Sequence, residues 1–180
     1  PLFRNLGELR KSAGTGSAQM GVAASYPVPF DNQGLVRVLS GVYQFFGTGG
    51  LTGLFSTLPG TRIEFVGGTW THLAVGAVGF SGGGEARFTG GTIRLLDRIP
   101  NLRLTGGTAV LLPDFQAAGA ITNLVLEGTT LAGTNLVLGT LVCQSVTGPL
   151  TVASGGLVNW TDGTFAGPVL VESNALLTLA

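Results

Sequence analysis

From residue 35 onward, the chain alternates apolar and polar residues over short runs that Gly, Ser, Asn and Pro separate. Three such runs are LVRVLSGVYQF at 35–45, RIEFVGGTW at 62–70 and NLVLEGTTL at 123–131. An alternation of period two between turn residues is the pattern of half-buried β-strands. The pattern therefore predicts an all-β fold built from many short strands.

One short phrase recurs along these runs, as IEFVGGT at 63–69, ARFTGGT at 86–92 and LRLTGGT at 102–108. Aligning the threonine that follows the glycine gives five positions: Thr69, Thr92, Thr108, Thr130 and Thr164. The spacing between neighbouring threonines is irregular, and the last interval divides evenly if Thr147 marks a degenerate copy. A repeat of this kind with two or three strands suits one coil of a β-solenoid.

The pattern therefore predicts a parallel β-helix (β-solenoid) with coils of roughly 16–23 residues. An antiparallel β-sandwich also gives short alternating runs, but the repeated phrase favours the solenoid. Two related phrases, FRNLGELRK at 3–11 and FDNQGLVRV at 30–38, extend the repeat toward the N-terminus. Residues 11–29 carry no lasting periodicity. We expect residues 1–29 to be a strand and an irregular Gly/Ala/Ser loop, a candidate cap, and residues 30–180 to form the solenoid.

Within each coil, alternate residues should face inward and the paired glycines should mark corners, where a positive φ or close approach of the next coil excludes a side chain. The expected inward residues include Phe65, Phe88, Leu102, Leu104, Leu124, Leu126 and Trp160. The expected corner positions are Gly67, Gly68, Gly90, Gly91, Gly106, Gly107, Gly128 and Gly163. The threonines after the corners would then lie above one another.

The amino-acid composition excludes several classes of binding partner and binding site. The chain has 9 basic and 9 acidic residues, so no large basic face is available for nucleic acid. No apolar stretch approaches the roughly 18 residues that a membrane-spanning helix needs. Cys143 is the single cysteine, which excludes a disulfide within the chain and a cysteine-based zinc site.

The residues that could carry chemistry are few and dispersed. His72 is the only histidine, and the acidic residues stand singly along the chain. Glu64 and Glu85, with Arg62 and Arg87, are expected to form a charge ladder across neighbouring coils rather than a catalytic pair. We therefore predict no catalytic residue, no cofactor and no metal site, and only Trp70 and His72 are candidates for a surface contact.

Four phrases, FDNQGLVRVLSGVYQF, RIEFVGGTW, ARFTGGTIRLL and LTVASGGLVNWTDGTF, together resemble the degenerate repeats of large secreted bacterial β-helix proteins. These repeats fill the passenger or stalk regions of autotransporter-like and haemagglutinin-like surface proteins. The resemblance covers roughly residues 3–180. It implies export, a secreted or cell-surface location, and a long solenoid of which this chain is a part.

The sequence repeats a structural unit and shows no pattern of a catalytic or metal site. We therefore predict a non-enzymatic structural protein of the bacterial exterior. Solenoid ends expose unpaired strand edges, so the expected partner is the protein itself, as a homopolymer or as neighbouring repeats of a longer chain. The alternative is a carbohydrate-binding surface adhesin, and a polysaccharide lyase or glycosidase is a less favoured third alternative. Because the sequence begins at Pro1 and ends within an alternating run, we expect an excerpt or a processed product.

Overall fold

A computed structural model describes residues 2–22 and 27–179 of the chain. Within these residues the chain forms short β-strands, which pair in parallel, and one 3-10 turn, η2 (Phe115–Ala117). The chain divides into two compact units. Unit 1 comprises residues 1–93 and 99–103, and unit 2 comprises residues 94–98 and 104–180.

Unit 1 contains three parallel sheets. The first sheet has β1 (Phe3–Asn5), β4 (Phe30–Asn32), β7 (Gly49–Leu51) and β10 (Thr69–His72). The second has β2 (Glu8–Lys11), β5 (Leu35–Val38), β8 (Gly53–Thr57) and β11 (Val78–Gly82). The third has β3 (Ser17–Met20), β6 (Val42–Phe46), β9 (Arg62–Gly67), β12 (Glu85–Phe88) and β14 (Leu102–Leu104). The unit boundary falls within β14 and within β13 (Thr92–Leu95).

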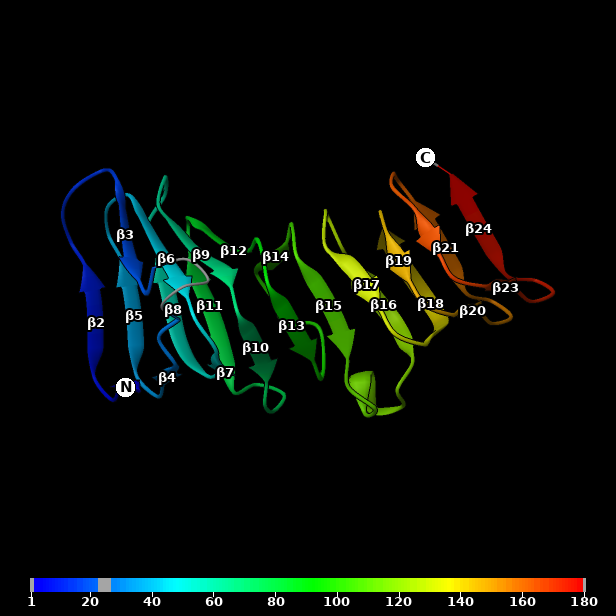
Figure 1. The fold of residues 1–180 in the computed structure, drawn as a ribbon, viewed down its shortest axis with the longest axis horizontal. Helices are drawn as coiled ribbons and strands as arrows, with labels where there is room; N and C mark the ends of the chain where they lie inside the picture. Colours follow the sequence, from blue (N-terminus) through cyan, green and yellow to red (C-terminus); the bar gives the residue numbers. More distant parts are fainter. Residues whose placement is uncertain (1, 23–26, 180) are drawn as a thin grey trace. The chain divides into compact units, whose positions relative to one another are not determined.

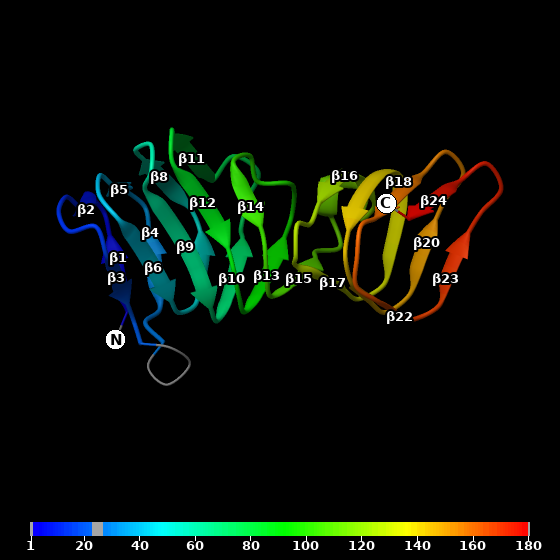
Figure 2. The same cartoon turned by 90° about the horizontal axis from the view of Figure 1, so that it is seen from above.

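The chain visits the three sheets of unit 1 in turn, so that each round of three strands is one coil (Figure 1). Figure 2 shows β3, β6, β9 and β12 of the third sheet side by side. Leu35 of β5 pairs with Leu54 of β8, whereas Phe3 of β1 pairs with the more distant Phe30 of β4, so coil length varies within the unit. The predicted β-solenoid is confirmed, and the sandwich is excluded because its strands would be antiparallel.

Unit 2 has the same parallel stacking of coils, in two sets of strands. One holds β15 (Thr108–Leu111), β17 (Thr130–Ala132), β19 (Val146–Thr147) and β22 (Phe165–Ala166). The other holds β16 (Ile121–Val125), β18 (Asn135–Cys143), β20 (Leu150–Val152), β21 (Leu157–Trp160), β23 (Val169–Val171) and β24 (Leu176–Leu179). β18 is long enough to pair with β20 at Asn135–Val137 and with β21 at Thr140–Cys143. The pairing of Val146 with Phe165 gives the same coil length as the pairing of Leu35 with Leu54.

The interiors of the two units differ in side-chain type. Unit 1 stacks aromatic rings from successive coils, and the Phe45 and Phe65 ring centroids lie 5.4 Å apart with nearly parallel planes. Phe55 and Phe80 stack in the same way at 4.9 Å. Unit 2 is filled mainly by aliphatic side chains, among them the fully buried Leu131, Leu141, Val146, Val152 and Val158. Of the predicted inward residues, Phe65, Phe88, Leu104, Leu124 and Leu126 are buried, whereas Leu102 and Trp160 are only partly so.

The N-terminal segment differs from the expectation. β1, β2 and β3 pair with β4, β5 and β6, so residues 3–20 form a coil of the solenoid. The segment 11–29 was expected to be a loop because its residues are small and polar, yet Ser17–Met20 is a strand. This strand forms because its backbone hydrogen-bonds to β6, and the intrinsic strand propensity of its own residues does not reveal that pairing. Residues 12–16 and 27–29 lie outside any strand, as expected, and residues 23–26 are outside the described residues.

The shared pattern of Phe, Asn and Gly in the two N-terminal phrases has a structural explanation. Asn5 and Asn32 are buried next to each other, and Asn5 Nδ2 donates to Asn32 Oδ1 over 2.7 Å. Asn32 Nδ2 in turn donates to the Thr52 carbonyl oxygen of the next coil over 3.1 Å. The pattern therefore marks the turn from the first sheet to the second, where side-chain amides satisfy polar groups inside the stack.

The glycine pairs lie between the third sheet and the first, and in each pair the second glycine carries the positive φ. Gly68 has φ +76°, and a Cβ placed there would lie 1.7 Å from the Gly47 carbonyl oxygen of the coil before. Gly91 and Gly107 also have positive φ, whereas Gly67, Gly90 and Gly106 do not. The second position thus requires glycine for its backbone conformation, and at Gly68 and Gly91 also because the neighbouring coil is close. At Gly90 the approach alone excludes a side chain, since a Cβ there would lie 2.3 Å from the Val66 carbonyl oxygen.

The threonines after the corners align partly as expected. Thr108 pairs with Thr130 in register. Thr147, taken as a degenerate copy, instead pairs with Ala132 and Ala166. Because Val146 pairs with Leu131 and Phe165, the residue beside Thr130 and Thr164 is Ser145. The last interval of the repeat is therefore divided at Ser145, and the sequence alignment missed this because serine replaces threonine.

The two glycines of VGGT provide a matched test of the corner. Replacing Gly68 by Ala should lower the free energy of unfolding by at least about 2 kcal/mol, because the change combines a positive φ with a backbone collision. Replacing Gly67 by Ala should change it by less than about 0.5 kcal/mol, since a Cβ at Gly67 meets no atom within 4 Å. Urea unfolding followed by circular dichroism measures both, and equal losses would contradict the proposed role of the corner.

Candidate functional site

The two residues proposed for a surface contact are both buried. Trp70 is 1% exposed and His72 is 2% exposed in β10, whose alternate residues face the interior. Trp70 pairs with Gly49, and a Cβ at Gly49 would lie 3.2 Å from Trp70 Cζ3, so the indole fills the space that this glycine leaves. Its Nε1 donates to the Gly67 carbonyl oxygen over 2.9 Å. Neither side chain is therefore presented to a ligand.

The predicted charge ladder is present on the outer face of the third sheet. Glu64 pairs in register with Arg87, and Arg62 with Glu85. Arg87 Nη2 lies 2.6 Å from Glu85 Oε2, and Arg103 Nη1 lies 3.0 Å from Glu85 Oε1. The hydrogen bond from Arg87 is the main cause that holds the pKa of the Glu85 carboxyl below its ordinary value of 4.5. Glu85 is thus paired with the coils on both sides, since Arg62 Nη1 also lies 4.0 Å from its Oε2, whereas Glu64 pairs with Arg62 within β9 over 2.8 Å.

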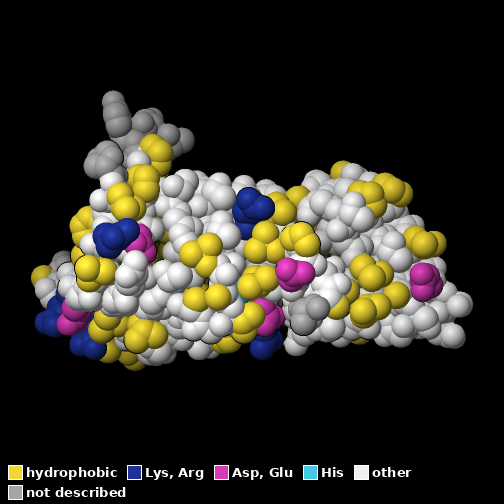
Figure 3. Space-filling view, turned by 90° about the horizontal axis from the view of Figure 1, so that it is seen from below, with side chains coloured by type: hydrophobic (Ala, Val, Ile, Leu, Met, Phe, Trp, Pro, Cys, Tyr) yellow, Lys and Arg dark blue, Asp and Glu magenta, His cyan; other side chains and the backbone are white. Residues whose placement is uncertain are grey.

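The same row continues through uncharged side chains. Gln44 Nε2 donates to Glu64 Oε2 over 2.7 Å, and Gln19 Nε2 donates to Gln44 Oε1 over 3.0 Å. One polar ladder therefore links four consecutive coils of unit 1. Each contact stabilises the stack only modestly, by about 0.2–1 kcal/mol, because the row lies at the surface. Elsewhere charge is sparse, and the face drawn in Figure 3 shows scattered charged groups between wide uncharged areas.

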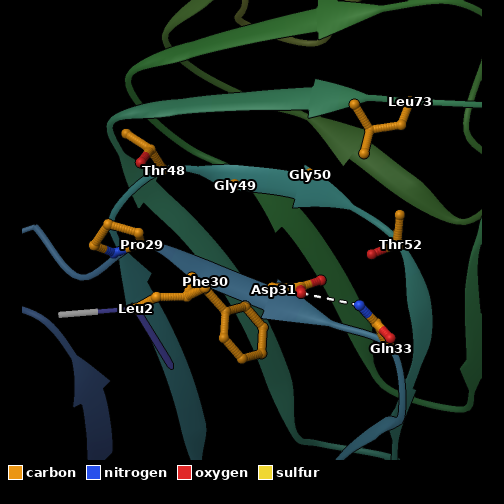
Figure 4. Close-up of a pocket in the computed structure, with 10 residues that line it drawn as sticks. All are labelled: Leu2, Pro29, Phe30, Asp31, Gln33, Thr48, Gly49, Gly50, Thr52 and Leu73. Carbon is orange, nitrogen blue, oxygen red and sulfur yellow. Dashed lines mark hydrogen bonds between the residues drawn. The ribbon is translucent and has the colours of Figure 1, made fainter. Parts of the chain in front are cut away.

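A hollow of about 560 Å³ lies on the outer side of the first sheet (Figure 4). Its lining residues come from β4, β7 and the segments next to them: Leu2, Pro29, Phe30, Asp31, Gln33, Thr48, Gly49, Gly50, Thr52 and Leu73. The ring of Phe30 turns away into the core, where it stacks on Phe45 at 4.9 Å. This volume is within the range of about 300–1,000 Å³ that small-molecule sites occupy.

Asp31 is the only ionisable residue among those that line the hollow. Arg4 Nε donates to its Oδ2 over 2.8 Å, and Gln33 Nε2 donates to the same oxygen over 3.0 Å. Both bonds fix the carboxylate, and within the described part of the chain Oδ1 accepts no hydrogen bond. The hollow therefore contains one oriented carboxylate with an oxygen available to a ligand.

This hollow was not among the sites expected from the sequence. A signal was present in Gly49 and Gly50, because glycines inside a strand often mark a close approach of backbone or ligand. Asp31 was treated only as part of the repeated phrase FDNQG. The outward direction of the Asp31 side chain depends on the register of β1, β4 and β7, which the sequence alone does not give.

The described residues show neither a metal cluster nor a membrane-spanning helix. No group of three or more His, Cys, Asp or Glu side chains in residues 2–22 and 27–179 is placed to hold a metal ion. Over the same residues, no helix is long and apolar enough to cross a bilayer.

Cys143 lies at the end of β18 and is fully buried. Burial raises the pKa of its thiol from 9.0 to about 11, because the thiolate would be poorly solvated inside the coil. Since the thiolate is the reactive form, the folded protein should protect this cysteine from alkylation.

Cys143 provides a test of the pH dependence of stability. Its pKa is higher in the folded state, so the unfolded chain loses the proton first as the pH rises, and stability should fall between about pH 9 and 11. Urea unfolding of the wild-type chain and of Cys143→Ala over this range measures the effect. The variant should show a smaller loss with pH, and parallel curves would contradict burial of the thiol. Alkylation by iodoacetamide should also be much faster in urea than in buffer.

Comparison with known proteins gives no relative from which a function can be transferred. No protein-family model matches the sequence, and no curated protein or solved structure is significantly similar to it. The chain is therefore classified by its fold alone, as a parallel β-solenoid.

Proposed function

We propose that this chain is a non-enzymatic structural protein of the bacterial exterior, a rigid β-solenoid that associates end to end. The observation that carries the proposal is the apolar surface of the last coil of unit 2. Five apolar residues there are more than a third exposed: Val169, Leu170, Val171, Leu176 and Leu179. The corresponding positions of the preceding coils are largely covered.

Register explains why these residues are apolar. Val169 pairs with Leu150, and Val171 pairs with Val152, and both of those partners are buried. Val169 and Val171 thus occupy core positions of the coil, yet they are 36% and 40% exposed. Such positions are covered when a further coil stacks on them, either from a second copy or from neighbouring repeats of a longer chain. The apolar residues of β23 therefore follow the pattern of a coil that has neighbours on both sides.

The first coil of unit 1 offers a complementary edge. β1, β2 and β3 each pair on one side, with β4, β5 and β6, and Leu2, Phe3 and Leu6 are exposed beside them. Parallel strands at both edges of one chain allow a head-to-tail contact between copies. A contact between two different surfaces does not close on itself unless the geometry forms a ring, so it produces linear assemblies.

Rigidity is supported by the way each unit is held together. Parallel hydrogen bonding joins every coil to the next, and the polar ladder ties the outer face of four coils. The exterior location is supported by the resemblance of the repeats to those of secreted bacterial β-helix proteins. A stalk or filament needs stiffness and repetition, and it does not need a catalytic centre.

Sedimentation velocity and negative-stain electron microscopy of the chain at rising concentration test the association. Linear assemblies should grow with concentration. Val171→Lys should shift the protein toward monomer, because a charge at the stacking surface would be desolvated in the contact. The shift in dissociation constant should be at least about tenfold.

The matched control is Leu138→Lys. Leu138 is 47% exposed in β18 of the same unit, but it faces outward from a coil that has neighbours on both sides. This variant should assemble like the wild-type protein. A chain that stays monomeric at every concentration would overturn the proposal, as would equal effects of the two lysines.

A further inference from the structure

We propose that the hollow above β4 and β7 binds a neutral polyol, in the form of a sugar ring of a neutral saccharide. The inference concerns unit 1 alone and does not depend on the structural role proposed above. It is based on the missing side chain at Gly50, the oriented carboxylate of Asp31, the local balance of charge and the apolar walls.

The hollow exists because one outward position in the sheet lacks a side chain. Arg4, Asp31, Gly50 and Thr71 pair in register across β1, β4, β7 and β10. Gly50 interrupts this row, and the Leu73 side chain leans toward the gap, since a Cβ at Gly50 would lie 2.5 Å from Leu73 Cδ1. Figure 4 shows Asp31 and Leu73 on opposite sides of Gly50. Leu73 therefore covers the backbone at Gly50 and forms one wall of the hollow, while Asp31 lies on the other side.

The polar groups around the gap offer both acceptors and donors. Asp31 Oδ1 is an acceptor, while Oδ2 is occupied by Arg4 and Gln33. Gln33 Nε2 uses one N–H for Asp31 and has a second. Thr52 Oγ1 donates to the Asn32 carbonyl oxygen over 2.6 Å, so its lone pairs remain as acceptors. Hydroxyl groups donate and accept, so neighbouring hydroxyls of a polyol match this mixed set.

Charge balance favours a neutral ligand. Asp31 is the only ionisable group in the lining, and Arg4 lies 2.8 Å from its Oδ2. The two charges cancel, so neither a cation nor an anion gains a large net attraction in the hollow. A hydroxyl that donates to Asp31 still forms a charge-assisted hydrogen bond, which is stronger than one between neutral groups.

The walls are apolar. Leu73 is 59% exposed and Leu2 is 56% exposed, and Pro29 is also accessible at the rim. Small-molecule sites combine such apolar walls with a few convergent polar groups that set orientation. A sugar ring has C–H groups that can pack on leucine and proline while its hydroxyls face the carboxylate. An inorganic anion or a simple amine has no surface that would use these walls.

Saturation-transfer difference NMR tests ligand class, because it reports binding whether or not the protein assembles. The probes are the methyl glycosides of glucose, galactose and mannose, with glucuronate as the anionic and glucosamine as the cationic comparison. At least one neutral glycoside should show transfer concentrated on its ring C–H protons. Absence of transfer to every neutral glycoside would overturn the proposal, as would stronger binding of either charged sugar.

Two glycine variants locate the site. Gly50→Thr should raise the dissociation constant of the neutral glycoside by at least about tenfold, because the added side chain displaces Leu73, which now lies over Gly50, and the two side chains together narrow the hollow. Gly79→Thr is the matched control, since Gly79 is likewise an outward strand glycine whose Cβ would meet an exposed leucine, Leu54, at 3.0 Å. The control should bind normally, and equal affinity in both variants would place binding elsewhere.

Asp31→Ala tests the chemistry of the same site. Loss of a charge-assisted hydrogen bond should weaken binding of the neutral glycoside by about tenfold or more. Circular dichroism should show an unchanged β spectrum, because the Arg4–Asp31 pair is at the surface. Undiminished binding by a folded Asp31→Ala chain would overturn the assignment of Asp31. Assembly measured on the same samples is a separate readout, so failure of the filament proposal would not be mistaken for failure of this one.

Discussion

Parallel hydrogen bonding between the backbones of successive coils is the constraint on which the rest of each unit depends. It sets neighbouring strands about 4.8 Å apart, a distance that no side chain can change. At several turns between sheets, the backbone of one coil lies directly on that of the coil before. Gly34 shows the result, because a Cβ there would lie 2.1 Å from the Gly7 carbonyl oxygen. Glycine at such turns is therefore required by stacking.

The fixed spacing also decides which side chains can occupy the interior. Residues in register must pack on one another at the strand distance, which suits flat aromatic rings in unit 1 and branched aliphatic groups in unit 2. Polar residues enter only when they bond to their counterpart in the next coil, as Asn5 does with Asn32. On the outside, the same register brings Glu64 beside Arg87, so the ladder is a consequence of coil spacing as much as of charge.

The sequence predicted most of what stacking requires and little of what depends on register. Phe65 and Phe88 were placed inside, and Glu64 and Glu85 in a ladder, because alternation and repeated phrases report directly on coil geometry. Trp70 was misassigned to the surface because it follows a corner threonine. The space opposite it is created by Gly49 in the preceding coil, and nothing local reveals this. The strand at Ser17–Met20 was missed for a similar reason, because it forms by pairing with β6 and its own residues show no strand pattern.

Stacking limits where a ligand or a partner can approach the described residues. The interior is filled, corners such as that at Gly68 are closed by the backbone of the neighbouring coil, and many of the charged residues of unit 1 pair with residues of adjacent coils. The outward row of each strand and the surface of a terminal coil remain accessible. We propose a ligand site in an outward row where one member lacks a side chain, as at Gly50, and an interface at a terminal coil whose core residues stay uncovered, as at Val169 and Val171. A solenoid can therefore acquire binding through a single outward glycine without any change to the residues that hold its coils together.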